Sequence, residues 1–276
     1  MNYIGILHHP RIPDSEPLAH EIAQWLTEQG VGTWIGSTWD EPGINGQLDR
    51  LSLLVVLGGD GSLLRAARLS VSGETPIFGV NMGRVGFLSE AQLDDWQERL
   101  RQVLNGQFWV ENRLMLYAML MRDGQIVDTF HALNDIVVGR GQQARVVRFT
   151  LRVDDDMVTN YTADALIVST PTGSTAYAMA AGGPLLPPQL QNFVVLPVAA
   201  HLSFDRALVL HETAVIQIEV RMDHEAYITP DGQHGISLRD RDTVIIRKNK
   251  QLIPFARVDT PGYFYRRLMS RLGYVR

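Results

Sequence analysis

Two apolar segments of this 276-residue chain end in glycine-containing loops, and these loops restrict the possible folds. Residues 51–57 are apolar except at Ser52, and the loop Gly58-Gly59-Asp60-Gly61-Ser62 follows them. Residues 165–169 precede a second loop, residues 170–177, whose Thr and Ser hydroxyls are potential hydrogen-bond donors to a ligand. Such segments predict strands buried on both faces, and glycine loops after them expose backbone N–H groups that bind anions. The pair of loops indicates a nucleotide site, and the carboxylate in the first loop favours phosphoryl transfer.

The composition is that of an ordinary globular protein, and it excludes several classes of function. Hydrophobic residues make up 45% of the chain and charged residues 20%, so the chain can bury a full core. The formal net charge of -5 gives no reason to expect nucleic acid or a membrane as a partner. The absence of cysteine excludes disulfides, thiolate metal sites and a cysteine nucleophile. The amino terminus lacks the basic region of a signal peptide, so we expect a cytoplasmic protein.

The pattern of the chain changes near residue 108. Before it, short apolar segments alternate with helical stripes, which is typical of a parallel sheet covered by helices. Strands are expected at residues 3–7, 51–57 and 77–80, and helices at residues 18–29, 62–69 and 93–104. After it, short alternating segments are separated by turn signals such as Asp123-Gly124. We therefore predict an α/β domain and an all-β sandwich domain, with helical spacing resuming at residues 261–272.

The loop from Gly58 to Ser62 has two interpretations from its residues alone. A tight turn between a strand and a helix would use Asp60 or Ser62 as the helix cap. A phosphate site would use the glycines to bring a bulky anion close to the amides at the helix amino terminus. In the second case Asp60 repels the phosphate, unless it takes a proton from an attacking hydroxyl or holds Mg²⁺ against the phosphates. No lysine follows the last glycine, so the loop is not a Walker A motif.

Three further polar residues precede predicted strands. Asn134 and Asp135 come before the apolar residues 136–138, and Asp164 comes before the buried segment 165–169. An Asx pair at such a place is usually a turn, whereas an amide beside a carboxylate can also bind ribose hydroxyls. Asp164 has the same two interpretations. Asp231-Gly232 is interpreted as an ordinary hairpin turn.

Taken in order, these motifs resemble those of the NAD kinase family, whose members phosphorylate the 2′-hydroxyl of the adenosine ribose of NAD. Residues 58–62 resemble the family's GGDGT, and residues 81–88 resemble its NxGxxGFL segment. Residues 132–135 resemble its LNE element, and residues 170–177 match TPTGSTAY throughout. Residues 231–233 resemble a DGQ turn of the family. The shared order of the matches, from about residue 51 to residue 233, makes the resemblance specific.

The resemblance implies a fold and a set of site residues. The family has a Rossmann-like α/β domain and a β-sandwich domain, with the last residues returning to the first domain. In this chain the α/β domain would comprise residues 1–107 and 255–276, and the β-sandwich domain would comprise residues 108–254. Asp60 would be the catalytic base, and Mg²⁺ or another divalent metal would come with the donor phosphates, with Asp60 as a candidate ligand and no dedicated metal site. Donor-phosphate contacts are implied for Gly58, Gly59, Gly61 and Ser62. NAD contacts are implied for Gly61, Phe87, Asn134, Asp135, Asp164, Thr175, Ala176 and Tyr177.

The resemblance also implies partners, and it leaves two alternatives. Family members use ATP or polyphosphate as donor and form homodimers or homotetramers. The chain departs from the family pattern at Asp135 in place of Glu, at Ala165 in place of Gly and at Ala180 in place of Ser. Diacylglycerol- and sphingosine-type lipid kinases share the GGDG loop but lack the TPTGSTAY segment. A non-catalytic dinucleotide sensor would gain nothing from a carboxylate beside phosphates, so phosphorylation of NAD is the predicted function.

Overall fold

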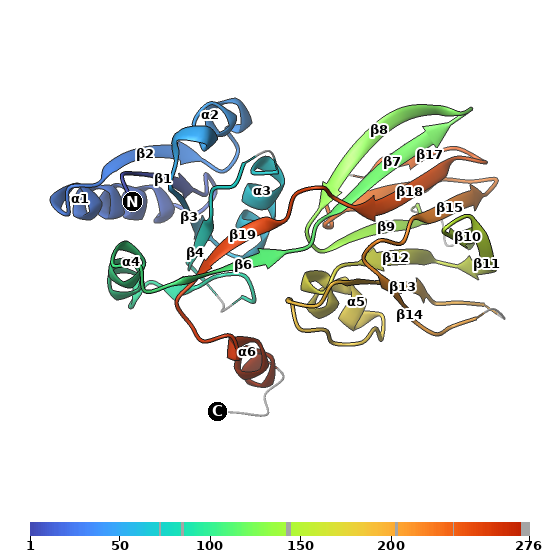
Figure 1. Ribbon diagram of the computed structural model, residues 1–276. Coiled ribbons are helices and arrows are strands. Elements are labelled where there is room, and N and C mark those ends of the chain that lie inside the picture. Colours follow the sequence, from blue (N-terminus) through green and yellow to red (C-terminus); the bar gives the residue numbers. More distant parts are fainter. Residues whose placement is uncertain (72, 84–85, 142–144, 202–203, 234, 272–276) are drawn as a thin grey trace. The chain divides into compact units, whose positions relative to one another are not determined.

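The computed structural model describes residues 1–71, 73–83, 86–141, 145–201, 204–233 and 235–271, and the chain divides into two compact units (Figure 1). The first unit holds residues 1–113 and the chain from Ile253 onward, and the second holds residues 114–252. The sequence predicted a β domain of residues 108–254, which is slightly longer than the second unit. The difference arises because β6 (Trp109–Arg113) pairs with β19 (Ile253–Arg257) in the sheet of the first unit.

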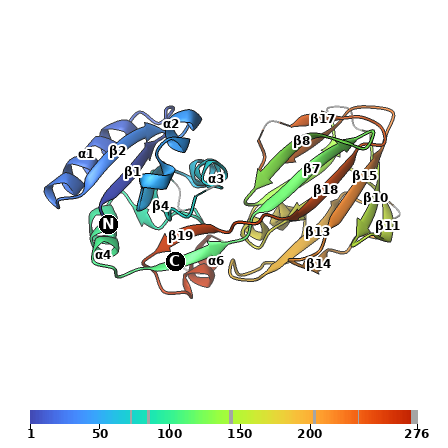
Figure 2. The same cartoon turned by 45° about the horizontal axis from the view of Figure 1, so that its top comes forward.

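The sheet of the first unit has five parallel strands in the order β2-β1-β3-β4-β19. Strand β6 is antiparallel at one edge, and the short β5 pairs with β4. The remaining strands are β1 (Tyr3–His8), β2 (Gly32–Ser37), β3 (Leu53–Gly58), β4 (Ile77–Asn81) and β5 (Ala91–Gln92). Figure 2 shows β1 and β2 side by side. Strand β3 is buried at every position, as its unbroken apolar sequence predicts.

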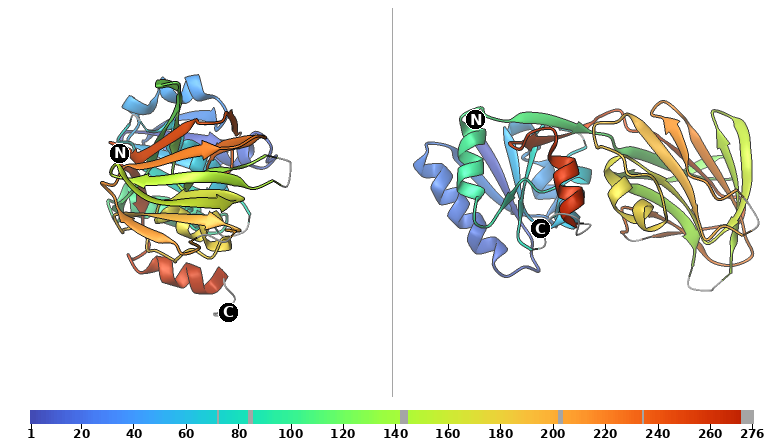
Figure 3. Two further views of the ribbon diagram at one scale, coloured as in Figure 1. Left: turned by 90° about the vertical axis from the view of Figure 1, so that its right-hand side faces the viewer. Right: turned by 90° about the horizontal axis from the view of Figure 1, so that it is seen from below.

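Helices cover both faces of this sheet. The helical segments are α1 (Ser15–Glu28), α2 (Glu41–Asn45), the 3-10 turn η1 (Leu48–Arg50), α3 (Asp60–Leu69), α4 (Trp96–Leu104) and α6 (Tyr263–Arg271). Ile22 of α1 and Leu100 of α4 pack with Val55 of β3 in one core, and the right-hand view of Figure 3 shows both helices. Helix α3 packs against the opposite face, where a side chain at Gly79 of β4 would collide with Leu63.

Most elements predicted for the first unit are present within a few residues of their expected ends. Helix α3 begins earlier than expected, so that Asp60 is its first residue and not part of a loop. Strand β2 and helix α2 were not predicted. Within the described residues, no helix is long and apolar enough to cross a membrane.

The second unit consists of two antiparallel sheets, β11-β10-β15-β18-β7-β8 and β14-β13-β12-β9-β16-β17. The first sheet contains β7 (Leu116–Arg122), β8 (Gln125–Ala132), β10 (Val147–Val153), β11 (Asp156–Ala163), β15 (Ile216–Arg221) and β18 (Thr243–Lys248). The second contains β9 (Asp135–Arg140), β12 (Ala165–Ser169), β13 (Asn192–Val198), β14 (Leu208–His211), β16 (Ala226–Pro230) and β17 (Ile236–Leu238). The sheets share one core, in which Phe149 and Ile218 of the first belong with Val168 and Phe193 of the second. After β12 the chain forms the 3-10 turn η2 (Thr172–Thr175) and the short helix α5 (Tyr177–Ala180).

Candidate active site

The first glycine loop lies at the carboxyl end of β3 in the first unit, the edge at which open α/β sheets bind ligands. Gly58 and Ser62 are buried, and the Oγ of Ser62 lies against Gly58 where a side chain at residue 58 would be. Gly59 and Gly61 are more open, since an added β-carbon at either would meet no neighbouring atom of the described chain within 4 Å. The loop therefore leaves room for a bulky group beside the amino terminus of α3.

Asp60 is held by two backbone amides from the segment that follows β4. The N–H of Phe87 donates to Oδ2 at 3.0 Å, and the N–H of Leu88 donates to Oδ1 at 3.1 Å. Hydrogen bonds to an ionised carboxylate are among the stronger ones in proteins, so they fix its orientation. Asp60 is partly exposed, and each oxygen keeps a further lone pair for another donor. A fixed, accessible carboxylate can accept a proton from a hydroxyl group placed beside it.

In the second unit, the loop of Asn134 and Asp135 packs against the loop that follows β12. The hydroxyl of Thr170 donates to the carbonyl oxygen of Leu133 at 2.6 Å, and the N–H of Thr170 donates to that of Asn134 at 2.9 Å. A β-carbon at Gly173 would lie 2.2 Å from the same Asn134 oxygen. The close approach of the two loops therefore requires glycine at residue 173.

The hydroxyls of the second loop are partly used inside the protein. Ser174 donates to the carbonyl oxygen of Pro171 at 2.7 Å and accepts from the N–H of Leu186 at 3.0 Å. Thr170 and Ser174 are fully buried. These two hydroxyls therefore donate their hydrogen bonds within the protein. Tyr177, at the end of the loop, is 45% exposed.

Asp231 anchors the loop of Asn134 and Asp135, a role that sequence analysis missed. Its Oδ1 accepts the N–H of Asn134 at 2.7 Å and that of Asp135 at 3.3 Å, and its Oδ2 accepts the N–H of Leu133 at 3.1 Å. The turn at Asp231 does join the antiparallel strands β16 and β17, as predicted. The pairing of Pro230 with Ile136 brings this turn to the start of β9. No local pattern in the sequence indicates that contact.

Asp135 is an unusual carboxyl group. It is 3% exposed, and this burial raises its pKa from 3.8 to about 7, with a further contribution from the negative charge of Asp231. A buried acid with a strongly shifted pKa and a defined charge partner is typical of a functional site. Asp135 therefore changes between a hydrogen-bond donor and a pure acceptor near neutral pH.

Asp164 and Tyr177 line a cavity of about 260 Å³ in the second unit. The other lining residues are Val137, Gly139, Arg140, Gly141, Ala165, Val198, Tyr227 and Thr229. The Oδ2 of Asp164 lies 3.1 Å from the Nε of Arg140, and both side chains are 32% exposed. The cavity thus offers a carboxylate, a guanidinium and an aromatic ring, which suit a ligand with hydroxyl, phosphate and base groups.

The described residues contain no group of three or more His, Cys, Asp or Glu side chains that could hold a metal ion. Mg²⁺ is commonly bound by one or two carboxylates together with substrate phosphates. Asp60, with its free lone pairs beside an open glycine loop, fits such a shared arrangement.

The predicted site residues fall into two groups, one in each unit. Gly58, Gly59, Asp60, Gly61, Ser62 and Phe87 lie in the first unit, around the amino terminus of α3. Asn134, Asp135, Asp164, Thr175, Ala176 and Tyr177 lie in the second. Asn134, Asp135 and Asp164 lie at the amino ends of β9 and β12, Thr175 and Ala176 lie at the end of η2, and Asp164 and Tyr177 line the cavity.

Comparison with known proteins identifies the family. Residues 29–108 match the ATP-NAD kinase N-terminal domain, and residues 133–258 match the ATP-NAD kinase C-terminal domain. The chain belongs to the NAD kinase family. A protein named NAD kinase in Chloroflexus aurantiacus is 38% identical over 272 residues, which cover 98% of each chain.

Two solved structures share the fold. Yeast NADH kinase complexed with NADH has a TM-score of 0.83 at 23% identity, covering 99% of this chain and 88% of that one. An NAD kinase from Archaeoglobus fulgidus in complex with ATP has a TM-score of 0.78 at 24% identity, covering 99% and 100%. The predicted family and the predicted α/β-plus-β fold are confirmed, and the lipid-kinase alternative is not favoured.

Proposed function

We propose that this protein transfers the terminal phosphoryl group of ATP to the 2′-hydroxyl of the adenosine ribose of NAD, giving NADP. The observation that carries the proposal is the carboxylate of Asp60, fixed by two amides beside the open glycine loop. It is supported by the match of both parts of the chain to NAD kinase domains. We also propose a homodimer or homotetramer, as the family resemblance implies, and a cytoplasmic location, as the amino-terminal sequence led us to expect.

In this mechanism Asp60 is the general base. It takes the proton of the 2′-hydroxyl as that oxygen forms a bond to the terminal phosphorus of ATP, and ADP leaves with the electrons of the broken P–O bond. Gly58, Gly59, Gly61 and Ser62 border the donor phosphates, where backbone amides and the helix dipole of α3 favour an anion. Mg²⁺, when bound with the donor, neutralises the phosphate charge.

The second unit supplies most of the NAD contacts. Asn134, Asp135 and Asp164 bind ribose hydroxyls, for which the buried carboxyl of Asp135 and the cavity beside Asp164 are suited. Thr175, Ala176 and Tyr177 line the nucleotide pocket. Gly61 and Phe87 of the first unit complete the set of NAD contacts.

The test is direct. Purified protein is incubated with NAD, Mg²⁺ and either ATP or polyphosphate, and NADP is followed with an NADP-specific dehydrogenase. NADP formed with ATP supports the proposal, and NADP formed only with polyphosphate keeps the family reaction and changes the donor. NAD binding without product from either donor would instead support the dinucleotide sensor.

Gly86→Ala is expected to lower kcat by about tenfold or more. A β-carbon at residue 86 would lie 1.9 Å from the Oδ1 of Asp60, so the carboxylate must leave its place beside the amides of Phe87 and Leu88. Displacement of a reacting group by about 1 Å can cost about a hundredfold in rate. The matched control is Gly83→Ala in the same segment, where an added β-carbon meets no described atom within 4 Å. Equal activity of the two variants in the NADP assay would contradict the proposed place of Asp60.

Asp231→Asn is expected to raise the KM for NAD by about tenfold or more. Asparagine keeps one acceptor oxygen, but its NH₂ group would face at least one of the three backbone N–H groups that now donate to Asp231. A buried backbone N–H group left without an acceptor costs about 1–3 kcal/mol. The matched control is Asp123→Asn, because both residues precede glycine in a left-handed turn, with φ of 48° and 49°. A KM for NAD that is the same in both variants would show that the anchoring of Asn134 and Asp135 does not matter for binding.

A further inference from the structure

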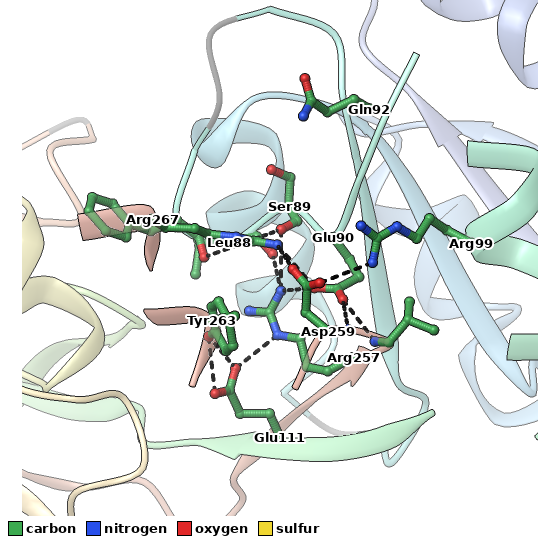
Figure 4. A network of polar contacts seen from close by, with 12 residues as sticks. Leu88, Ser89, Glu90, Gln92, Arg99, Glu111, Arg257, Asp259, Tyr263 and Arg267 are labelled. Atoms are coloured by element: carbon green, nitrogen blue, oxygen red, sulfur yellow. Dashed lines mark hydrogen bonds and ion pairs between the residues drawn. The ribbon is translucent and has the colours of Figure 1, made fainter. Parts of the chain in front are cut away.

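A buried network of charged side chains contacts the segment whose amides bind the carboxylate of Asp60 (Figure 4). Its centre is Arg257, the last residue of β19, which is 0% exposed. The Nη1 of Arg257 donates to the carbonyl oxygen of Leu88 at 2.9 Å. The same guanidinium pairs with Glu90 at 3.1 Å and with Glu111 at 2.9 Å. The network therefore connects β19 with the segment that follows β4.

Arg267 of α6 binds the same segment from another element. Its Nη1 donates to the carbonyl oxygen of Phe87 at 3.5 Å and also to that of Ser89. Its Nη2 lies 3.4 Å from Glu90 and 3.1 Å from Asp259. The side chain is 14% exposed, and Figure 4 shows it approaching the segment on the side of Tyr263. Two arginines from the carboxy-terminal part of the chain thus converge on residues 87–90.

Phe87 and Leu88 are therefore bound by both of their backbone polar groups. Their N–H groups donate to the carboxylate of Asp60, and their carbonyl oxygens accept from Arg267 and Arg257. The carbonyl oxygen of Phe87 lies in the same peptide plane as the N–H of Leu88, so Arg267 holds the plane that carries this N–H group. Arg257 holds the next plane, between Leu88 and Ser89, so the two guanidinium groups restrain the backbone on both sides of Leu88.

Stability alone is a weak explanation for the network. Buried ion pairs often contribute no more to stability than apolar side chains of the same size, because desolvation offsets their attraction. Buried ion pairs can instead hold the groups around them in one arrangement. Arginine is suited to this task, since its planar fork binds a carbonyl and a carboxylate at once and stays charged at all relevant pH values.

We propose that Arg257 and Arg267 are positioning residues for phosphoryl transfer, because they hold the peptide planes on both sides of Leu88 and so fix the short segment whose amides bind the carboxylate of Asp60. This inference rests on the proposed role of Asp60 as the base. It assigns to the end of the chain, far in sequence from the glycine loop, a part in setting the rate of the chemical step.

The main experiment uses Arg267, because it is at the rim of the network and its replacement leaves the pair of Arg257 and Glu111 in place. Arg267→Met is expected to lower kcat about tenfold, to change the KM for NAD less than twofold, and to speed hydrogen exchange at the amides of Phe87 and Leu88. Arg267→Lys keeps a charged donor and should restore part of kcat. The matched control is Arg266→Met on the same helix, an exposed residue that donates to the hydroxyl of Thr260 at 3.2 Å.

The outcomes separate this inference from the proposed function. A fully active Asp60→Asn enzyme would reject the base and the positioning role together. An inactive Asp60→Asn enzyme beside an Arg267→Met enzyme with unchanged kcat and unchanged amide exchange would reject only the positioning role. If Arg267→Met does not fold, Arg267→Gln and Arg257→Lys are compared with Arg266→Met in the same way, and normal kcat in both would overturn the inference.

Discussion

Asp60→Asn is expected to reduce NADP formation by about a hundred- to ten-thousand-fold, the usual contribution of a general base. Asparagine has nearly the same shape as aspartate, but its amide group cannot take the proton of the 2′-hydroxyl. Its NH₂ group would also face one of the two N–H groups that the carboxylate now accepts, which adds to the loss of rate. NAD binding should be nearly unchanged, because most of the proposed NAD contacts lie in the second unit. The rate is measured by the coupled NADP assay, and NAD binding by titration calorimetry on the same preparation.

The matched control for this variant is Asp94→Asn, an exposed aspartate in the same unit, which should keep full activity. Full activity of Asp60→Asn would show that the hydroxyl loses its proton to another group. Activity lost in proportion to NAD affinity would show that Asp60 binds substrate and does not accept its proton. Only loss of kcat with retained affinity agrees with the base.

The features that could be predicted from sequence are those set by short segments. Strand β3 is apolar at almost every position and is followed at once by glycine, so its burial and its loop follow from local pattern. The same holds for the turn at Asp123-Gly124, where both residues have positive φ. Strand β2 gave no such pattern, because it is half-buried at most positions and contains two glycines. Its pairing with β1 decides its structure.

The contacts that could not be predicted join residues far apart in the sequence. Asp231 reaches the amides of residues 133–135 only because β16 pairs with β9. Arg257 reaches Leu88 because β19 lies beside β4 in the sheet. In the second loop, residue type showed that Thr170 and Ser174 can form hydrogen bonds, but not that they form them with the protein's own backbone. Residue type gives the capacity for a contact, and the topology decides the partner.

Stability is expected to fall as the pH rises from about 4 to about 7 because of Asp135. Its pKa in the folded protein, about 7, lies above the ordinary value of 3.8, so the folded protein holds a proton in this range that the unfolded chain has released. Protonation therefore favours folding. A difference of about three pKa units corresponds to about 4 kcal/mol of free energy of unfolding. This contribution is present near pH 4 and is fully lost above pH 7.

Asp135→Asn keeps a neutral side chain at every pH, so it should remove this dependence. Its free energy of unfolding should equal that of the parent near pH 4 and exceed it by about 4 kcal/mol at pH 8, as measured by urea unfolding at pH 4.5, 6 and 8. The matched control is Asp156→Asn, which changes the first residue of another strand where the side chain is exposed. Parallel curves for the parent and Asp135→Asn would show that Asp135 is ionised throughout.

The same titration has an opposite effect on the proposed binding of NAD. Below pH 7 the protonated carboxyl of Asp135 offers a donor, and above pH 7 the carboxylate offers only acceptors to the ribose hydroxyls. NAD affinity of the parent should therefore rise through pH 7 as stability falls, whereas affinity of Asp135→Asn should stay low and constant. Because the charge of Asp231 adds to the raised pKa of Asp135, Asp231→Asn should move both transitions to lower pH. A shift in the stability curve without one in the affinity curve would assign the ribose contact to another residue.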